Sequence, residues 1–265
     1  MGRLVRLIAA AACAAELAAP AMAADDPLAR ARQLYNQQQY EAAVNAAEQA
    51  RLTPARVDAA DLIAARAYLE RFRSSQASDD LTNARLRLRR LDPARFEPSE
   101  RTEYLVGLGE ALYFDGAYGA AADIFDSVLR GGDLIAADQR ERVLDWWADA
   151  LDHDARPRPD IDRQAVYRRI RVRMDEELAL RPGNSVAAYW RAASARAQGD
   201  LQTAWDAAEA AWVRAPLAAD GGDRLRRDLD ALMQDGVIPE RAKASGVPPQ
   251  RLQTEWDQFK EQWKK

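Results

Sequence analysis

The chain has 265 residues, with 38 basic and 42 acidic side chains, one histidine and one cysteine. A net charge of −4 argues against a general nucleic-acid binder, which is normally basic. The length is enough for an ample hydrophobic core in one or two domains.

The first 23 residues have the features of a secretory signal peptide. Arg3 and Arg6 precede an alanine-rich apolar run over residues 7–15, and Ala21-Met22-Ala23 supplies a small-x-small cleavage pattern. The apolar run is shorter than the roughly 20 residues that span a bilayer. We therefore expect residues 1–23 to be removed, the protein to be exported to the periplasm, and no transmembrane segment to remain.

Cys13, the one cysteine, allows a different outcome for the same segment. If cleavage occurs just before Cys13 and the thiol is acylated, the protein becomes a membrane-anchored lipoprotein. That processing favours leucine three residues upstream, where this chain has Ala10. With cleavage after Ala23 the mature chain has no cysteine, and therefore no disulfide and no thiol chemistry.

From Asp26 onward the sequence has helical periodicity, and the alternating β-branched runs that are typical of strands are missing. Alanine, leucine, arginine, glutamate and glutamine dominate, and all of them favour helices. Short breaks divide the chain into segments of about one helix each. They are Thr53-Pro54, Asp92-Pro93, Glu97-Pro98, Gly131-Gly132, Arg156 to Pro159, Arg181 to Gly183, Gly221-Gly222 and Pro248-Pro249. The sequence therefore predicts an all-α protein.

A spaced alanine pattern pairs these segments. Each copy of the pattern contains a small residue, which lets one helix approach its neighbour closely. Apolar residues four and seven positions after this residue extend the same buried stripe of the helix. The pattern occurs at Ala43-Ala47-Ala50, Leu81-Ala84-Leu88-Leu91, Ala121-Phe125-Val128 and Ala204-Ala208-Ala211. Corners precede three of these sets, at Gln39-Tyr40, Asp115 to Tyr118 and Gly199 to Thr203, and Pro216 closes the last.

These features resemble the tetratricopeptide repeat, in which a small residue, a corner glycine, an aromatic, an alanine and a closing proline recur on two antiparallel helices. The residues that carry the resemblance are Gly109, Gly116, Tyr118, Ala121 and Phe125, and then Ala192, Gly199, Ala204, Ala208, Ala211 and Pro216. The resemblance implies about five helical hairpins over residues 27–216, stacked as a right-handed superhelix.

The spacing departs from that family. With a degenerate unit placed around Val166, Ile170, Met174 and Leu178, the repeat is about 40 residues long instead of the usual 34 or so. We expect longer helices and loops, such as residues 74–80 and 153–160, to accommodate the excess.

Residues 217–265 follow a different pattern and are predicted to form capping helices over 223–233, 239–244 and 249–264. Repeat arrays need an end piece that covers the last apolar face. A one-sided stripe in the last helix consists of Leu252, Trp256, Phe259 and Trp263. The stripe fits this cap, or alternatively a helix that docks a partner or lies on a membrane surface.

Residue types that support catalysis or metal binding are scarce. His153 lies in an Asp-rich stretch that we expect to be a solvated loop, and a metal site would need further nitrogen or sulfur ligands or a calcium-loop spacing. No serine has the context of a catalytic nucleophile, and no glycine loop has the lysine that cradles phosphate. The sequence predicts no catalytic residue, no metal and no cofactor. Carboxylate chemistry in a helical enzyme stays a minor alternative.

The resemblance also implies an inner face, formed by the first helix of each hairpin. Carried over by position, it comprises Arg32, Tyr35, Asn36, Glu110, Tyr113, Phe114, Tyr189 and Arg196. Tyrosine is enriched in interfaces, but these tyrosines could equally pack between repeats. Capture of a C-terminal carboxylate is not expected, because that type of groove needs lysine beside asparagine and no lysine lies near Asn36.

Together these observations predict a non-catalytic periplasmic scaffold or adaptor that binds a protein or peptide, not nucleic acid, on a concave helical surface. The alternative is a non-catalytic helical subunit of a cell-envelope enzyme or secretion machine.

Overall fold

The computed structural model describes residues 26–131 and 135–263. Every regular element in these two ranges is helical, and no strand occurs in them, so the all-α prediction is confirmed. The predicted signal peptide and Cys13 lie outside the described residues.

The helices follow the predicted breaks closely. They are α1 (Pro27–Asn36), α2 (Tyr40–Ala50), α3 (Val57–Ser75), α4 (Ser78–Leu88), α5 (Pro98–Phe114), α6 (Tyr118–Arg130), α7 (Ala137–Ala155), α8 (Asp160–Leu180), α9 (Ser185–Ala197), α10 (Leu201–Arg214), α11 (Asp223–Leu232), α12 (Ile238–Ser245) and α13 (Pro249–Gln262). Short 3₁₀ turns lie at Pro54–Arg56, Pro93–Arg95 and Ala215–Leu217, and a π-helical turn at Met233–Val237 joins α11 to α12.

Local chemistry sets where these helices begin and end. Asn184 and Asp200 cap α9 and α10, because their side-chain oxygens accept hydrogen bonds from backbone N–H groups in the first turn. Gly116 and Gly199, at the α5–α6 and α9–α10 corners, have φ of 76° and 77°, a left-handed conformation that glycine adopts without a steric penalty.

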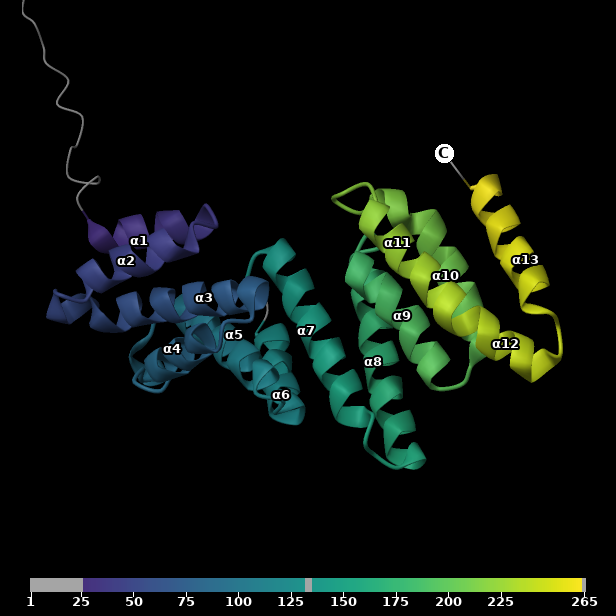
Figure 1. Ribbon diagram of the computed structural model, residues 1–265, viewed down its shortest axis with the longest axis horizontal. Helices are drawn as coiled ribbons and strands as arrows, with labels where there is room; N and C mark the ends of the chain where they lie inside the picture. The colour runs from purple at the N-terminus through teal and green to yellow at the C-terminus, as the bar shows by residue number, and fades with distance from the viewer. Residues whose placement is uncertain (1–25, 132–134, 264–265) are drawn as a thin grey trace, which may run out of the picture.

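The helices stack in a row that has repeat character (Figure 1). Each helix from α1 to α4 and from α5 to α10 packs on the next, and the odd-numbered helices also contact one another: α1 with α3, α3 with α5, α5 with α7, α7 with α9 and α9 with α11. The alanines that define the repeat have no exposed surface: Ala43, Ala84, Ala121 and Ala204. The odd-numbered helices therefore form a continuous face along the row.

The extra repeat length lies in helices, and the two long loops predicted from the sequence are wrong. Only residues 76 and 77 separate α3 from α4, and α7 continues through His153 to Ala155. Trp147, Leu151 and Ala155 extend one buried stripe of α7 at four-residue spacing, which keeps the last turn helical. The degenerate unit is the 21-residue helix α8, where Ile170 and Met174 are fully buried.

Candidate functional site

The face of α7 opposite its buried stripe is strongly acidic. Its carboxylates recur three or four residues apart, at Asp138, Glu141, Asp145, Asp149 and Asp152. That spacing places them along one side of the helix. Because α7 lies in the middle of the row, between α5 and α9, this side forms part of the continuous odd-numbered face.

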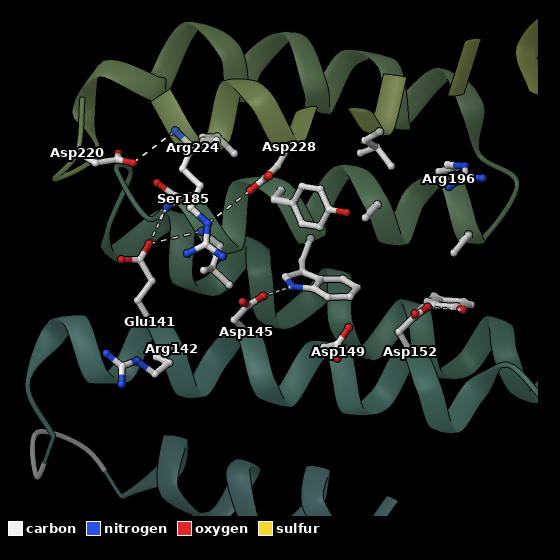
Figure 2. A pocket seen from close by; sticks show the side chains of 18 of the residues that line it. Glu141, Arg142, Asp145, Asp149, Asp152, Ser185, Arg196, Asp220, Arg224 and Asp228 are labelled. Atoms are coloured by element: carbon white, nitrogen blue, oxygen red, sulfur yellow. Dashed lines mark hydrogen bonds and ion pairs between the residues drawn. The ribbon is translucent and has the colours of Figure 1, made fainter. Parts of the chain in front are cut away.

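A cavity of about 1040 Å³ lies against this acidic side, and we call it the acidic groove. Figure 2 shows carboxylates of α7 on one wall and Arg224 and Asp228 of α11 on the opposite wall, with α9 between them. The lining contains eight carboxylates and four arginines, which leaves four negative charges. The carboxylates are Asp138, Glu141, Asp145, Asp149, Asp152, Asp220, Asp228 and Glu240, and the arginines are Arg142, Arg156, Arg196 and Arg224.

Aromatic side chains of α9 line the floor of the acidic groove. Tyr189 and Trp190 meet edge to face, with ring centroids 5.6 Å apart. The Trp190 indole N–H donates a hydrogen bond to Asp145 at 2.8 Å. Burial raises the pKa of Asp145, and the hydrogen bond from Trp190 partly opposes this. Asp145 is thus a partly desolvated carboxyl at the edge of the Trp190 ring, and a cation bound there would be favoured because it supplies a counter-charge.

Two further carboxylates of α7 are oriented by tyrosine hydroxyl groups. The Tyr113 hydroxyl of α5 donates to Asp149, and the Tyr167 hydroxyl of α8 donates to Asp152 at 2.8 Å. Burial, followed by this hydrogen bond, raises the pKa of Tyr167 to about 12. A neutral donor fixes the position of a carboxylate and leaves its charge in place, as at Asp149, whereas Asp152 also pairs with Arg156 at 2.6 Å.

Other acidic residues of the acidic groove already have structural partners. Glu141 accepts hydrogen bonds from the backbone N–H groups of Ser185 at 2.8 Å and Val186 at 3.4 Å, so it caps the N-terminus of α9. Asp220 accepts from the Gly222 N–H at 2.8 Å, and Glu240 pairs with Arg196 at 2.6 Å.

The surplus negative charge of the acidic groove belongs mainly to carboxylates that have no close cationic partner. The Asp138 side chain forms no hydrogen bond or ion pair with another described residue, and Asp228 has Arg224 at 3.7 Å. Together with Asp145 and Asp149, which accept hydrogen bonds from neutral donors, these residues carry most of the uncompensated charge of the acidic groove.

A second cavity, of about 270 Å³, lies further along the same face between α1, α3, α5 and α7; we call it the Glu110 pocket. It shares Asp138 and Arg142 with the acidic groove, so the two cavities adjoin at α7. Arg142 reaches across to Glu70 of α3 at 3.3 Å. The residues that line the Glu110 pocket are Tyr35, Asn36, Gln38, Tyr40, Arg66, Glu70, Ser99, Glu103, Val106, Glu110, Ile135, Asp138, Gln139, Arg142 and Val143.

Glu110 is the most perturbed carboxyl of this second cavity. Its side chain is buried, with 9% of the residue surface exposed, and it forms no hydrogen bond or ion pair with another described residue. Burial raises its pKa from 4.5 to about 7, with a further contribution from Glu70, while Arg66 opposes the shift. A carboxyl that is desolvated and unpaired is a candidate binding group.

The structure places five of the predicted groove residues on the two cavities. Tyr35, Asn36 and Glu110 line the Glu110 pocket, and Tyr189 and Arg196 line the acidic groove. The other three lie outside both. Arg32 is exposed and pairs with Glu100 at 2.8 Å.

Tyr113 and Phe114 pack between neighbouring hairpins. Both rings lie against Trp146 of α7, at centroid distances of 4.6 and 5.4 Å. Only the Tyr113 hydroxyl reaches the acidic groove, through Asp149. The tyrosines therefore divide between the two roles left open by the sequence.

Most of the aromatic stripe of α13 is turned inward. Leu252 is 3% exposed and Trp256 is fully buried, with the Trp256 ring 5.5 Å from Trp212 and its N–H bonded to Asp230 at 2.8 Å. Phe259 stacks on Trp256 at 5.7 Å and is partly buried, whereas Trp263 is half exposed. Leu252 and Trp256 thus belong to the core, which leaves little of the stripe for docking a partner.

The predicted solvated loop around His153 is wrong, because these residues are helical and engaged. His153 stacks on Tyr118 at 4.5 Å and lies 3.8 Å from Asp149. Among the described residues, no group of three or more histidine, cysteine, aspartate or glutamate side chains is placed to hold a metal ion. In the same parts of the chain, no helix combines the length and apolar character needed to cross a bilayer.

In comparisons with known proteins, no family model, no curated protein and no solved structure matches this chain. The likeness to the tetratricopeptide repeat therefore stays a prediction from the sequence. The function is inferred below from the two cavities, their charges and the helices that form them.

Proposed function

We propose that the chain is a non-catalytic scaffold, of tetratricopeptide-like superhelical form, that binds a polypeptide carrying positively charged side chains. The binding surface is the face made by the odd-numbered helices, and α11 to α13 act as the cap. The observation that carries the proposal is the acidic groove, where eight carboxylates face four arginines beside Tyr189 and Trp190.

The groove chemistry favours a cationic polypeptide over other partners. Its four surplus negative charges repel anions such as nucleic acid, and they attract lysine and arginine side chains. The Tyr189 and Trp190 rings add aromatic surface on which cationic or apolar groups can pack. The acidic groove has a volume of about 1040 Å³, at the upper end of the usual range for ligand sites. It therefore has room for several side chains.

The place of action follows from the N-terminal segment. If residues 1–23 direct export as their sequence predicts, the partner is another protein of the cell envelope. A scaffold and a non-catalytic subunit of an envelope machine would use the same groove, so the chemistry of the bound segment is common to both.

Fluorescence anisotropy with two labelled peptides tests the proposal. One is a nonapeptide of alternating lysine and serine, and the other has glutamate in place of lysine. We expect the lysine peptide to bind and the glutamate peptide not to bind. The double variant D145N/D149N should bind about tenfold more weakly, because two unpaired charges of the groove are lost.

A matched control separates the groove from the overall charge. D123N/E176Q removes the same two charges from exposed positions on α6 and α8, outside both cavities, and should change the affinity by less than about twofold at 0.15 M salt. Equal loss in both double variants, or equal binding of the two peptides, would refute the proposal.

A further inference from the structure

The Glu110 pocket contains both acidic and basic side chains, and only some of them have a partner within the protein. Four of its charged side chains, Arg66, Glu70, Glu103 and Arg142, are already paired. Arg66 donates to Glu103 at 2.8 Å and lies 4.5 Å from the centre of the Tyr35 ring. Glu70 is held by Arg142 at 3.3 Å and also by Arg73. These pairs leave Glu110 as the buried carboxyl without a counter-charge.

The Glu110 carboxyl and the Tyr35 hydroxyl are two groups of this pocket that are free to bind a ligand. The Glu110 carboxyl and the Tyr35 hydroxyl line the same cavity, and neither forms a hydrogen bond with another described residue. Glu110, at 9% exposed, loses most of its water without gaining a partner, and a suitable ligand would offset that cost. Both groups can accept hydrogen bonds, and the Glu110 carboxylate carries a negative charge when ionised, so a cationic donor matches both.

We propose that the Glu110 pocket binds a single primary ammonium group, the end of a lysine side chain of the same polypeptide that occupies the acidic groove. The identification of the ligand as a lysine of that polypeptide depends on the proposed function. The ammonium site itself stands on the pocket.

The size and walls of the pocket suit a lysine side chain. Its volume of about 270 Å³ exceeds the roughly 150 Å³ of a cavity that admits benzene. Val106, Ile135 and Val143 supply apolar wall for the methylene stem. The ammonium group has three donors, of which Glu110 and Tyr35 can accept two.

The position of the pocket agrees with this assignment. It adjoins the acidic groove at Asp138 and Arg142, so one extended segment can occupy both. Within the lining, four carboxylates face two arginines, which leaves two negative charges when Glu110 is ionised. The second cavity thus continues the electrostatic character of the first.

The protonation of Glu110 gives the site a pH dependence. Around Glu110 lie Tyr35 of α1, Tyr40 of α2, Arg66, Glu70 and Arg73 of α3, Glu103 of α5, and Asp138 and Arg142 of α7. Their combined effect, together with burial, places the pKa of Glu110 at about 7. An ammonium ligand needs the ionised carboxylate, so affinity should rise about tenfold between pH 6 and pH 8.

The test uses n-butylammonium as the probe and n-butanol as its neutral analogue, with binding followed by chemical shifts of the backbone amides of α5. At pH 8 we expect saturable binding of n-butylammonium to the wild type and none of n-butanol. Glu110→Gln, which keeps the shape and removes the charge, should weaken binding at least about tenfold. Tyr35→Phe should weaken it about threefold, since one acceptor is lost.

Other results would overturn the assignment. If n-butylammonium binds E110Q as well as the wild type, or if n-butanol binds equally, the pocket is not an ammonium site. If D145N/D149N abolishes binding of the lysine peptide while E110Q leaves it unchanged, the lysine assignment fails and the proposed function stands. If neither variant affects the peptide, the proposed function fails, and n-butylammonium binding alone decides whether the ammonium site exists.

Discussion

Replacing Glu110 by glutamine should stabilise the protein, which is unusual for a change at a buried position. In the unfolded chain the carboxyl titrates near 4.5, whereas in the folded protein its pKa is about 7. The folded state therefore holds the proton more tightly, and wild-type stability falls as the pH rises from about 4.5 through 7. At pH 8 this difference in pKa lowers the unfolding free energy of the wild type by about 1 to 3 kcal/mol, and the lower figure allows for water entering the pocket.

Urea unfolding followed by far-UV circular dichroism at pH 4, 6 and 8 measures this effect. We expect Glu110→Gln to match the wild type at pH 4 and to exceed its unfolding free energy by about 1–3 kcal/mol at pH 8. Glu176→Gln, at an exposed carboxyl outside both cavities, should show no pH-dependent difference. If Glu110→Gln is less stable than the wild type at pH 8, the carboxylate has a partner in solution and the Glu110 pocket is wrongly described.

Three further predictions concern the fold and the N-terminus. Trp256→Ala should lower the unfolding free energy by about 3–5 kcal/mol because the ring is fully buried, whereas Trp263→Ala, at a half-exposed ring, should cost less than about 0.5 kcal/mol. In α5, Gly109→Ala should destabilise by about 1–3 kcal/mol in urea unfolding, because the new methyl group would lie 2.5 Å from a phenylalanine ring. Gly107→Ala, whose nearest contact is 3.6 Å, should be neutral or stabilising by up to about 1 kcal/mol. Mass spectrometry of the exported protein should find Ala24 as the first residue, and an acylated cysteine would contradict the predicted cleavage site.

The helices could be predicted because local sequence determines them. A proline or a glycine lies in nearly every connection between helices. The spaced alanines identify the helix surfaces that pack closely against their neighbours. Ala121 and Ala204 are fully buried, as their place in the repeat requires. The end of α7 was mispredicted because Asp152, His153 and Asp154 are polar, while the buried stripe that keeps them helical runs along the other side.

The candidate site was predicted only in part. The resemblance placed Glu110 and Tyr189 on the inner face, and both line cavities. The acidic side of α7 was visible in the sequence as carboxylates three or four residues apart, but its meaning depends on Trp190 and Asp228 from other helices. The unpaired state of Glu110 could not be predicted, because it depends on which neighbours have paired with one another in three dimensions.

The central claim is that a cationic segment lies in the acidic groove, and the Trp190 indole N–H reports on it directly. This is one of seven indole groups, and it donates to Asp145 inside the groove, whereas the indole N–H groups of Trp205 and Trp256 donate to Glu209 and Asp230 outside it. In ¹⁵N-labelled protein titrated with the lysine–serine peptide, we expect the Trp190 indole signal to shift saturably while those of Trp205 and Trp256 stay in place. If the peptide binds and the Trp190 signal does not move, the groove is not the binding site.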